Sequence, residues 1–185
     1  RRNSWLSASG RVAAWSTLPF FLGIHDIDML HWVLGERIVS VYARAVRKVI
    51  GTNDDTVIAS VRFSRGGIGA IELSWALPDV SGNRRSPMLE IVGSKGYAHV
   101  ILSDQGVTLH TPQGVAVPDF WYGFQPILHG HMVGVYREEL LHFWRCVRRD
   151  EAPAVTPEEA LDAVRVATAI ERSLQENADI PVLYA

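Results

Sequence analysis

The sequence predicts an α+β fold, an open and mostly antiparallel sheet of about six strands with helices on one face. Hydrophobic and polar residues alternate with a period of two through much of residues 38–112, which is typical of strands. Short glycine-containing turns join these segments, and such turns favour antiparallel pairing because parallel neighbours need long crossovers. Residues 24–34, 132–149 and the segment that begins at Thr156 instead show the spacing of amphipathic helices.

The first predicted helix covers residues 24–34. Ile24, Ile27 and Leu34 recur at helical spacing, and either Leu30 or His31 completes the same face. Gly35 follows the last periodic residue, where glycine commonly ends a helix. Four titratable residues interrupt this otherwise apolar stretch: His25, Asp26, Asp28 and His31.

The predicted strands follow in chain order. The first, 38–49, and the second, 56–64, are separated by the turn sequence "GTNDD" and have one apolar face each. The others cover 67–77, 88–94, 96–102 and 106–112. Helices on one side alone would leave a sheet face uncovered, and we expect it to include apolar residues of the strands: Val57, Ala59, Val61, Ile71 and Leu73.

Residues 112–131 predict an ordered loop, and two helices follow it. The first helix covers residues 132–149, with one apolar face made of Val133, Tyr136, Leu140, Phe143 and Val147. The second begins at "TPEEAL", where Thr156 is the expected N-cap, Pro157 the first helical residue and Glu159 the partner in a capping box. Its buried face is expected to contain Ala163, Val166, Ile170 and Leu174.

Composition predicts a soluble globular protein. The chain of 185 residues has a net charge of −2 and 48% hydrophobic residues, which argues against binding to nucleic acid or an anionic membrane. Cys146 is the only cysteine, so no intrachain disulfide can form and a reducing cytoplasm is expected. The pattern around it predicts a packed thiol rather than a nucleophile. We expect one domain over 1–185, and the start at "RRN" predicts a piece of a longer protein.

His25 and Asp28 are the candidate functional residues of the first helix. At a spacing of three they share a helix face, as do Asp28 and His31, whereas Asp26 points elsewhere. A histidine and a carboxylate on one edge can move a proton and accept a hydrogen bond from a hydroxyl-bearing substrate. Alternatively, Asp26 and Asp28 only stabilise the helix N-terminus.

Other chemical motifs give little support to competing functions. A metal site made by His25, Asp28 and either His129 or His131 is disfavoured, because no ligand spacing in the loop predicts that these residues converge. The sequence has no G-x-G-x-x-G, H-E-x-x-H or G-x-S-x-G motif, and "GSKG" at 93–96 reads as a turn between strands. No metal is therefore expected.

The ordered set of motifs resembles the C-terminal domain of the Gfo/Idh/MocA family, the glucose-fructose oxidoreductase and inositol dehydrogenase family. The segments that carry the resemblance are "GIHDIDMLHWVLGE", "IVSVYARA", "IELSW", "LEIVGSKGYAHV", "YREELLHFWRCVRRDEAPAVTPEEALDAVRVATAIERSLQEN" and the terminal "IPV". They cover nearly the whole chain.

The resemblance implies a substrate-binding and oligomerisation domain of an enzyme that oxidises or reduces a sugar, polyol or related compound with NAD or NADP. The Rossmann domain that holds the nicotinamide would lie upstream, outside this chain. His25 matches the family's active-site histidine, and Asp28 matches a carboxylate that holds substrate hydroxyls. The family's polyol dehydrogenases usually have an Asp four residues before the histidine, and here that residue is Phe21.

Two further expectations concern additional substrate contacts in the long loop and the oligomeric state of the protein. Trp121, Tyr122 and His129 lie in the long loop and are candidate substrate contacts, although aromatic residues there would serve equally well to cover the sheet. In the family the open sheet face pairs with another subunit, which implies a homodimer. A second function class stays open, a non-catalytic ligand-binding or assembly module in which Phe21 marks a lost proton relay.

Overall fold

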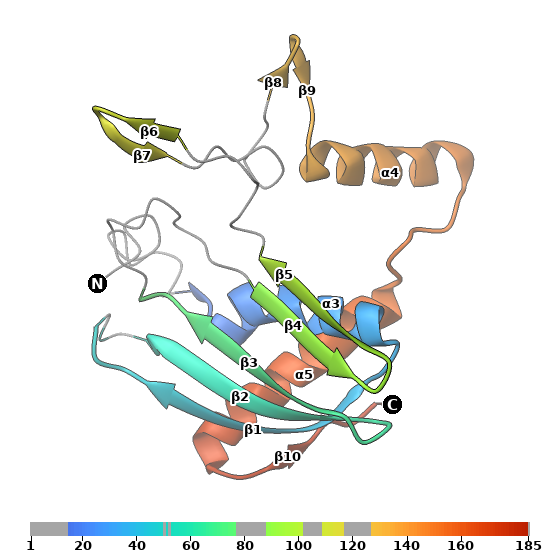
Figure 1. The fold of residues 1–185 in the computed structure, drawn as a ribbon. Helices are drawn as coiled ribbons and strands as arrows, with labels where there is room; N and C mark the ends of the chain where they lie inside the picture. Colours follow the sequence, from blue (N-terminus) through green and yellow to red (C-terminus); the bar gives the residue numbers. More distant parts are fainter. Residues whose placement is uncertain are drawn as a thin grey trace. The chain divides into compact units, whose positions relative to one another are not determined.

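The computed structural model describes residues 15–49, 51, 53–76, 88–101, 109–116 and 127–184 (Figure 1). The chain divides into two compact units. Unit 1 consists of Arg1–Asp79 together with Val155–Ala185, and unit 2 consists of Val80–Ala154.

Unit 1 is built on an antiparallel sheet with the strand order β10-β1-β2-β3. The strands are β1 (Ile38–Val46), β2 (Thr56–Phe63), β3 (Ile68–Ser74) and the short β10 (Ile180–Pro181). In β2 buried and exposed side chains alternate, as the period of two predicts.

The prediction that these apolar residues lie on the uncovered face of the sheet was wrong. Val57, Ala59, Val61, Ile71 and Leu73 are at most 4% exposed, because they face the helices. The other face of the sheet carries the intervening residues of each strand, among them Ile58 at 50% and Ile68 at 82% exposure. The period of two was read correctly, but the sequence does not show which of the two faces the helices cover.

Among the described residues, three helical segments cover one face of this sheet: η1 (Pro19–Gly23), α3 (Ile24–Leu34) and α5 (Pro157–Glu176). In Figure 1, α5 runs behind the sheet, and none of the described helices of unit 1 lies in front of it. The α5 N-terminus has the predicted capping box between Thr156 and Glu159, with Pro157 in its first turn. The predicted buried face is also confirmed, since Ala163, Val166 and Ile170 are at most 1% exposed and Leu174 packs against the core.

Two buried polar side chains, those of Ser173 and Asp55, form hydrogen bonds to the backbone of neighbouring segments in unit 1. The backbone N–H of Ala43 donates to Ser173 Oγ at 2.8 Å, and this hydroxyl donates to the carbonyl of Ala178 at 2.6 Å. An edge N–H of β1 therefore finds its acceptor on α5. In the β1–β2 turn, the buried carboxylate of Asp55 accepts from the backbone N–H groups of Lys48 and Val49, which confirms the turn predicted there.

The described part of unit 2 contains three hairpins and one helix. The hairpins pair β4 (Met88–Gly93) with β5 (Gly96–Ile101), β6 (Leu109–Thr111) with β7 (Gly114–Ala116), and β8 (Ile127–Leu128) with β9 (His131–Met132). The predicted turn "GSKG" joins β4 to β5. The predicted loop 112–131 contains β7 and β8, and α4 (Val135–Arg149) begins three residues later than predicted.

The apolar face predicted for α4 is exposed. Leu140, Phe143 and Val147 have exposures of 68%, 64% and 70%. Cys146 is the buried residue of this helix, with its Sγ at 3.5 Å from His142 Nε2, which confirms the packed thiol. Among the described helices none is long and apolar enough to cross a membrane.

The α+β fold class is confirmed, with helices on one face of an antiparallel sheet. The six predicted strands all exist, as β1 to β6, and the terminal "IPV" supplies β10. The strand pairing differs from the single sheet that was predicted. Among the described residues, β4 pairs with β5 and β6 pairs with β7 in separate hairpins. Local patterns predict strands well, but pairing depends on contacts between distant segments.

Candidate active site

The candidate site lies on α3, whose position is set by tight packing at its start. A π-helical turn, η1, leads directly into α3, and such turns are frequent at functional sites. A Cβ added to Gly23 would lie 2.8 Å from Cδ1 of Leu73, so only glycine fits there without displacing a core side chain. At the other end, Gly35 has φ = +60° and its N–H donates to the carbonyl of His31 at 2.9 Å, as predicted for the helix end.

His25 and Asp28 lie on the uncovered side of α3. His25 is exposed and Asp28 is half-buried. Apolar side chains surround them on the same surface, with exposures of 36% for Met29, 82% for Trp32 and 46% for Val33. The buried residue Ile27 faces the opposite direction. The structure therefore has the imidazole and the carboxylate on one side of α3, as their spacing predicts, and it places them among exposed apolar side chains.

Phe21 belongs to the core side of this segment. Its ring centroid lies 5.4 Å from that of Trp75, with the two ring planes tilted by 43°. This geometry is favourable for an aromatic pair. Trp75 is 1% exposed, and its indole Nε1 has no hydrogen-bonding partner among the described residues. The residue that stands where the resemblance predicts a carboxylate is thus used for packing.

Asp26 does not cap α3. It lies in the first turn of this helix, but η1 continues straight into that turn and no side chain makes a capping hydrogen bond. Burial raises the pKa of Asp26, and the neighbouring His25 partly lowers it. Desolvation of this carboxylate costs stability at neutral pH, which is the opposite of what a helix cap contributes. The capping alternative for Asp26 is therefore wrong.

His31 joins the end of α3 to the start of β1. Its Nε2 accepts a hydrogen bond from the backbone N–H of Ile38 at 3.2 Å, which requires an unprotonated nitrogen. Burial lowers the pKa of His31, and this effect outweighs the opposite influence of Asp162 and Asp28; Arg37 also lowers it. The buried carboxylate of Asp162 is itself paired with Arg37 at 2.8 Å and with Arg165 at 2.6 Å.

The lowered pKa of His31 predicts a loss of stability in mild acid. The unfolded chain takes up a proton on His31 near pH 6.5, while the folded protein resists this, so the stabilisation is complete above that pH and falls as the pH drops below it. Urea unfolding at pH values on both sides should show this slope in the wild type, and a flatter one in His31→Gln. His110→Gln, at an exposed position, is the matched control. Equal slopes in all three proteins would contradict the assignment.

The other predicted site residues lie elsewhere or outside the described residues. His129 is exposed in the turn between β8 and β9, in unit 2, with φ = +51°. Trp121 and Tyr122 fall outside the described ranges. Within the described ranges, no three His, Cys, Asp or Glu side chains are grouped so as to hold a metal ion.

Sequence reasoning missed two features of unit 1. Trp75 was noted as part of a motif, but its contact with Phe21 spans 54 positions and has no signal in the local pattern. A polar pocket lined by Thr17 and Glu171 was missed for the same reason. Chemically, the surface of α3 can take and release a proton at His25 and accept a hydrogen bond at Asp28.

Comparison with known proteins identifies the domain. Residues 18–182 match the family model described as the oxidoreductase family, C-terminal alpha/beta domain (Gfo/Idh/MocA). A myo-inositol 2-dehydrogenase of Thermotoga maritima is 29% identical over 163 residues, which is 85% of this chain and 46% of that protein. The chain thus spans about half the length of this relative.

Solved structures show the same fold. The myo-inositol 2-dehydrogenase of Lactobacillus plantarum matches 98% of this chain and 54% of its own, at 19% identity and a TM-score of 0.74. The scyllo-inositol dehydrogenase of Lactobacillus casei, solved with NAD(H) and scyllo-inositol, matches 95% of this chain and 53% of its own, at 17% identity and a TM-score of 0.67. The family match over residues 18–182, together with this fold, shows that the chain belongs to the Gfo/Idh/MocA oxidoreductase family, as its C-terminal alpha/beta domain.

Proposed function

We propose that this chain is the substrate-binding domain of an NAD- or NADP-dependent oxidoreductase that acts on a hydroxyl or carbonyl carbon of a sugar, polyol or related compound. The observation that carries the proposal is the pair His25 and Asp28, presented together on the uncovered side of α3 in a domain of this family. The inositol dehydrogenases to which the chain is similar make polyols the first substrates to test.

In the proposed reaction, His25 takes the proton of the substrate hydroxyl. The carbon that bears this hydroxyl loses a hydride, and a carbonyl forms as the O–H bond breaks. The nicotinamide supplies the hydride acceptor when it is bound. Asp28 accepts a hydrogen bond from a neighbouring hydroxyl and so fixes which carbon faces the cofactor. In the reductive direction, His25 returns the proton to the carbonyl oxygen.

Phe21 changes the surroundings of His25 in this scheme. A carboxylate at residue 21 would orient the imidazole and favour its charged form, but the ring of Phe21 packs on Trp75 instead. Because the side chain of His25 is exposed, the proton can pass from the imidazole to solvent without a relay through residue 21. We propose this route for the reaction of this protein.

The described residues do not fit a dinucleotide. They contain no glycine-rich loop between a strand and a helix, and "GSKG" forms the β4–β5 hairpin turn. We therefore place the cofactor on a Rossmann domain upstream in a longer protein. The exposed side chains of Met29, Trp32 and Val33 provide an apolar surface on which that domain can pack. Trp121, Tyr122 and His129 stay predictions as further substrate contacts.

The test is an assay of the full-length protein. We expect reduction of NAD or NADP, followed by absorbance of the reduced cofactor, when myo-inositol, scyllo-inositol or glucose is supplied. The 185-residue chain alone should show no turnover and no tight binding of NAD. Micromolar affinity of this chain for NAD would contradict the placement of the cofactor on another domain. An upstream sequence without a Rossmann fingerprint would contradict the enzymatic role.

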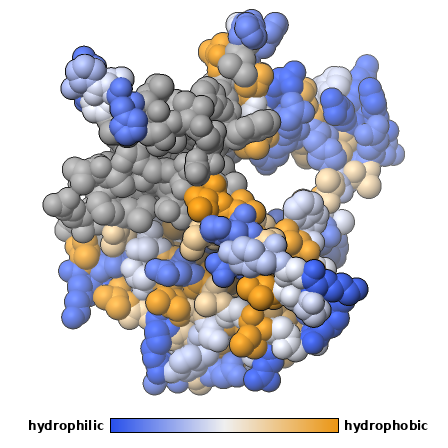
Figure 2. All heavy atoms as spheres, in the orientation of Figure 1, coloured by the Kyte–Doolittle hydropathy of each residue, from blue (hydrophilic) through white to orange (hydrophobic). Residues whose placement is uncertain are grey.

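We further propose that the open face of the unit 1 sheet forms a homodimer. Apolar side chains are exposed on all three long strands, with exposures of 51% for Val46, 50% for Ile58 and 82% for Ile68. Figure 2 shows apolar and polar side chains intermingled over this surface. Arg44, Ile58 and Glu72 form one cross-strand row with opposite charges at its ends. A two-fold axis near Ile58 would place Arg44 of each copy opposite Glu72 of the other copy.

The dimer proposal predicts that Ile58→Arg gives a monomer. Light scattering should report twice the chain mass for the wild type, and the single chain mass for this variant, because an arginine at the centre of the interface loses its hydration and faces a second copy of itself. Leu183→Arg, at a site that is 74% exposed outside the long strands, should leave the dimer intact. A wild type that is monomeric at high concentration would contradict the proposal.

The second candidate function is a non-catalytic ligand-binding or assembly module on the same scaffold. The packing of Phe21 onto Trp75 is the observation that favours it, because it removes a carboxylate from the vicinity of His25. This candidate predicts a dimer and sugar binding in the full-length protein without turnover. Cofactor reduction in the assay above would exclude it.

A further inference from the structure

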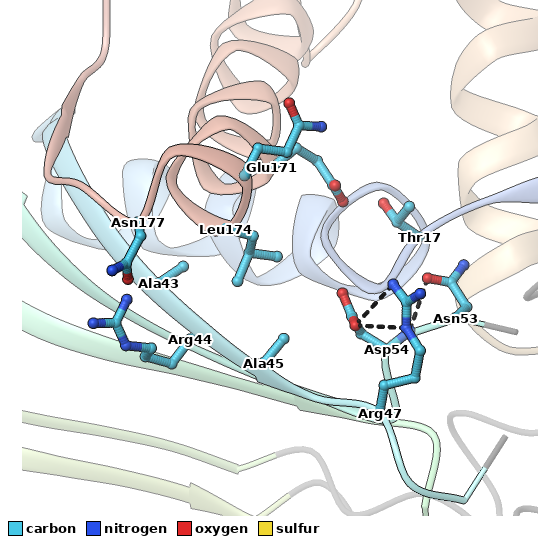
Figure 3. A pocket seen from close by; sticks show the side chains of 11 residues that line it. Thr17, Ala43, Arg44, Ala45, Arg47, Asn53, Asp54, Glu171, Leu174 and Asn177 are labelled. Atoms are coloured by element: carbon cyan, nitrogen blue, oxygen red, sulfur yellow. Dashed lines mark hydrogen bonds and ion pairs between the residues drawn. The ribbon is translucent and has the colours of Figure 1, made fainter. Parts of the chain in front are cut away.

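The junction between α3 and β1 is held by two side chains that bind Ile38, the first residue of β1. Ile38 is completely buried, its N–H donates to Nε2 of His31 at 3.2 Å, and its carbonyl accepts from the hydroxyl of Tyr184 at 2.6 Å. The junction lies at the other end of β1 from the polar pocket that Ala43 and Ala45 line (Figure 3). The three residues at the junction do not line that pocket, so the two places are separate.

The hydrogen bond to Ile38 fixes the protonation of His31. Nε2 accepts this bond and so carries no proton, and the proton of the neutral ring is assigned to Nδ1 on that ground. When Nε2 gains a proton, the bond to Ile38 breaks, because both ring nitrogens are then donors. The imidazolium that results needs a different acceptor.

Three charged side chains act on His31 from three segments. Asp28 of α3 and Asp162 of α5 favour its charged form, whereas Arg37, between α3 and β1, opposes it. Burial has the largest effect, so the pKa of His31 is lowered. The charge of this ring therefore changes in mild acid, below about pH 6.5.

Asp28 is the carboxylate that is available to the charged ring. Asp162 is already paired with Arg37 at 2.8 Å and with Arg165 at 2.6 Å. Asp28 takes part in none of the salt bridges between described residues. It precedes His31 by three positions, which brings the Cβ atoms of the two residues to about 5–6 Å from each other. His31 lies in the last turn of α3, where a positive charge is favourable.

The other polar groups at the junction have partners of their own. Glu36 pairs with Arg65 at 3.1 Å. Burial raises the pKa of Tyr184 to about 12, so its hydroxyl stays protonated and continues to donate to Ile38. His31 is therefore the group at this junction whose charge changes in mild acid.

We propose that His31 is a positioning residue for Asp28 and makes substrate binding depend on pH. Unprotonated His31 holds Ile38 and leaves the carboxylate of Asp28 to accept from a substrate hydroxyl. Protonated His31 releases Ile38 and pairs with Asp28, and the substrate hydroxyl then competes with the imidazolium for this carboxylate. The inference rests on the proposed function, in which Asp28 binds that hydroxyl.

The first experiment measures kcat and KM of the full-length protein for myo-inositol from about pH 5 to about pH 8. In the wild type KM should rise about threefold in mild acid, as expected for competition with a partly exposed ion pair. In His31→Gln the pH profile of KM should lose this rise, because the glutamine amide accepts from Ile38 at every pH and gains no charge. The profile of kcat should be the same in both proteins, because His25 is unchanged. His110→Gln, at an exposed position, is the matched control and should keep the wild-type profiles.

The second experiment needs no activity. The ¹⁵N signals of the His31 ring in the full-length protein, assigned by their loss in His31→Gln, should show the proton on Nδ1 at neutral pH. As His31 gains its second proton, the amide signal of Ile38 should shift with the same midpoint. In Asp28→Asn this midpoint should fall by about 0.5 pH unit, because the carboxylate that stabilises the imidazolium is gone.

Three results would overturn the proposal. The first is a proton on Nε2 of His31 at neutral pH, the second is a midpoint that Asp28→Asn does not move, and the third is the same KM profile in the wild type and His31→Gln. A full-length protein that turns over no polyol would instead defeat the proposed function. The titration of His31 in the wild type and in Asp28→Asn would then still decide whether the two side chains pair. Amide spectra that match the wild type away from the junction confirm that the variants fold.

Discussion

Replacing His25 by alanine in the full-length protein is expected to lower kcat/KM for the polyol substrate by about 10²–10⁴-fold. The imidazole is the only group in the proposed mechanism that takes the substrate proton, and its loss leaves water to do so. The fall should appear mainly in kcat, because His25 acts on the reacting hydroxyl rather than on the rest of the substrate. Steady-state rates of cofactor reduction measure it.

The controls for His25 separate chemistry from structure. Asp28→Asn keeps the shape of the side chain and should mainly raise KM, because Asp28 holds a hydroxyl that does not react. His110→Ala removes an exposed imidazole in unit 2 and should leave the rates unchanged. Equal kcat/KM for the wild type and His25→Ala would remove His25 from the reaction. His25 is exposed, so its replacement should not affect folding.

Replacing Ile170 by alanine is expected to destabilise unit 1 by about 2–5 kcal/mol. The side chain of Ile170 is completely buried and belongs to the core between α5 and the sheet. Shortening it loses apolar burial and leaves a cavity that the packed strands cannot easily close. Urea unfolding followed by circular dichroism gives the change in the free energy of unfolding, provided that the slope with urea is unchanged.

The matched control for Ile170 lies on the same helix. Leu161 is 46% exposed near the start of α5, and Leu161→Ala should change the free energy of unfolding by no more than about 0.5 kcal/mol. The two variants differ from the wild type by comparable losses of apolar side chain, so burial is the main difference between them. Similar losses of stability in both would contradict the position of α5 against the sheet.

The placement of the candidate residues on α3 was predictable from the local sequence, whereas their role in a reaction stays a prediction. The spacing of His25 and Asp28 placed both residues on one surface of a helix, and the structure has them there. The residue expected to cap that helix, Asp26, was misread because the π-helical turn before it cannot be seen in the sequence pattern. The close approach at the start of α3 also joins distant segments, since Gly23 lies against Leu73, a residue of a strand that follows much later in the chain.

The sequence by itself determined the short-range features of this protein. The capping box of Thr156 and Glu159, the helix end at Gly35 and the alternation of β2 all depend on residues a few positions apart, where local hydrogen bonds and sterics dominate. Tertiary structure alone decided which sheet face the helices cover and how the strands pair. It also decided that Phe21 meets Trp75 and that Thr17 and Glu171 line one pocket. These contacts join distant segments, and their free energy depends on the packing of the whole core rather than on any local pattern.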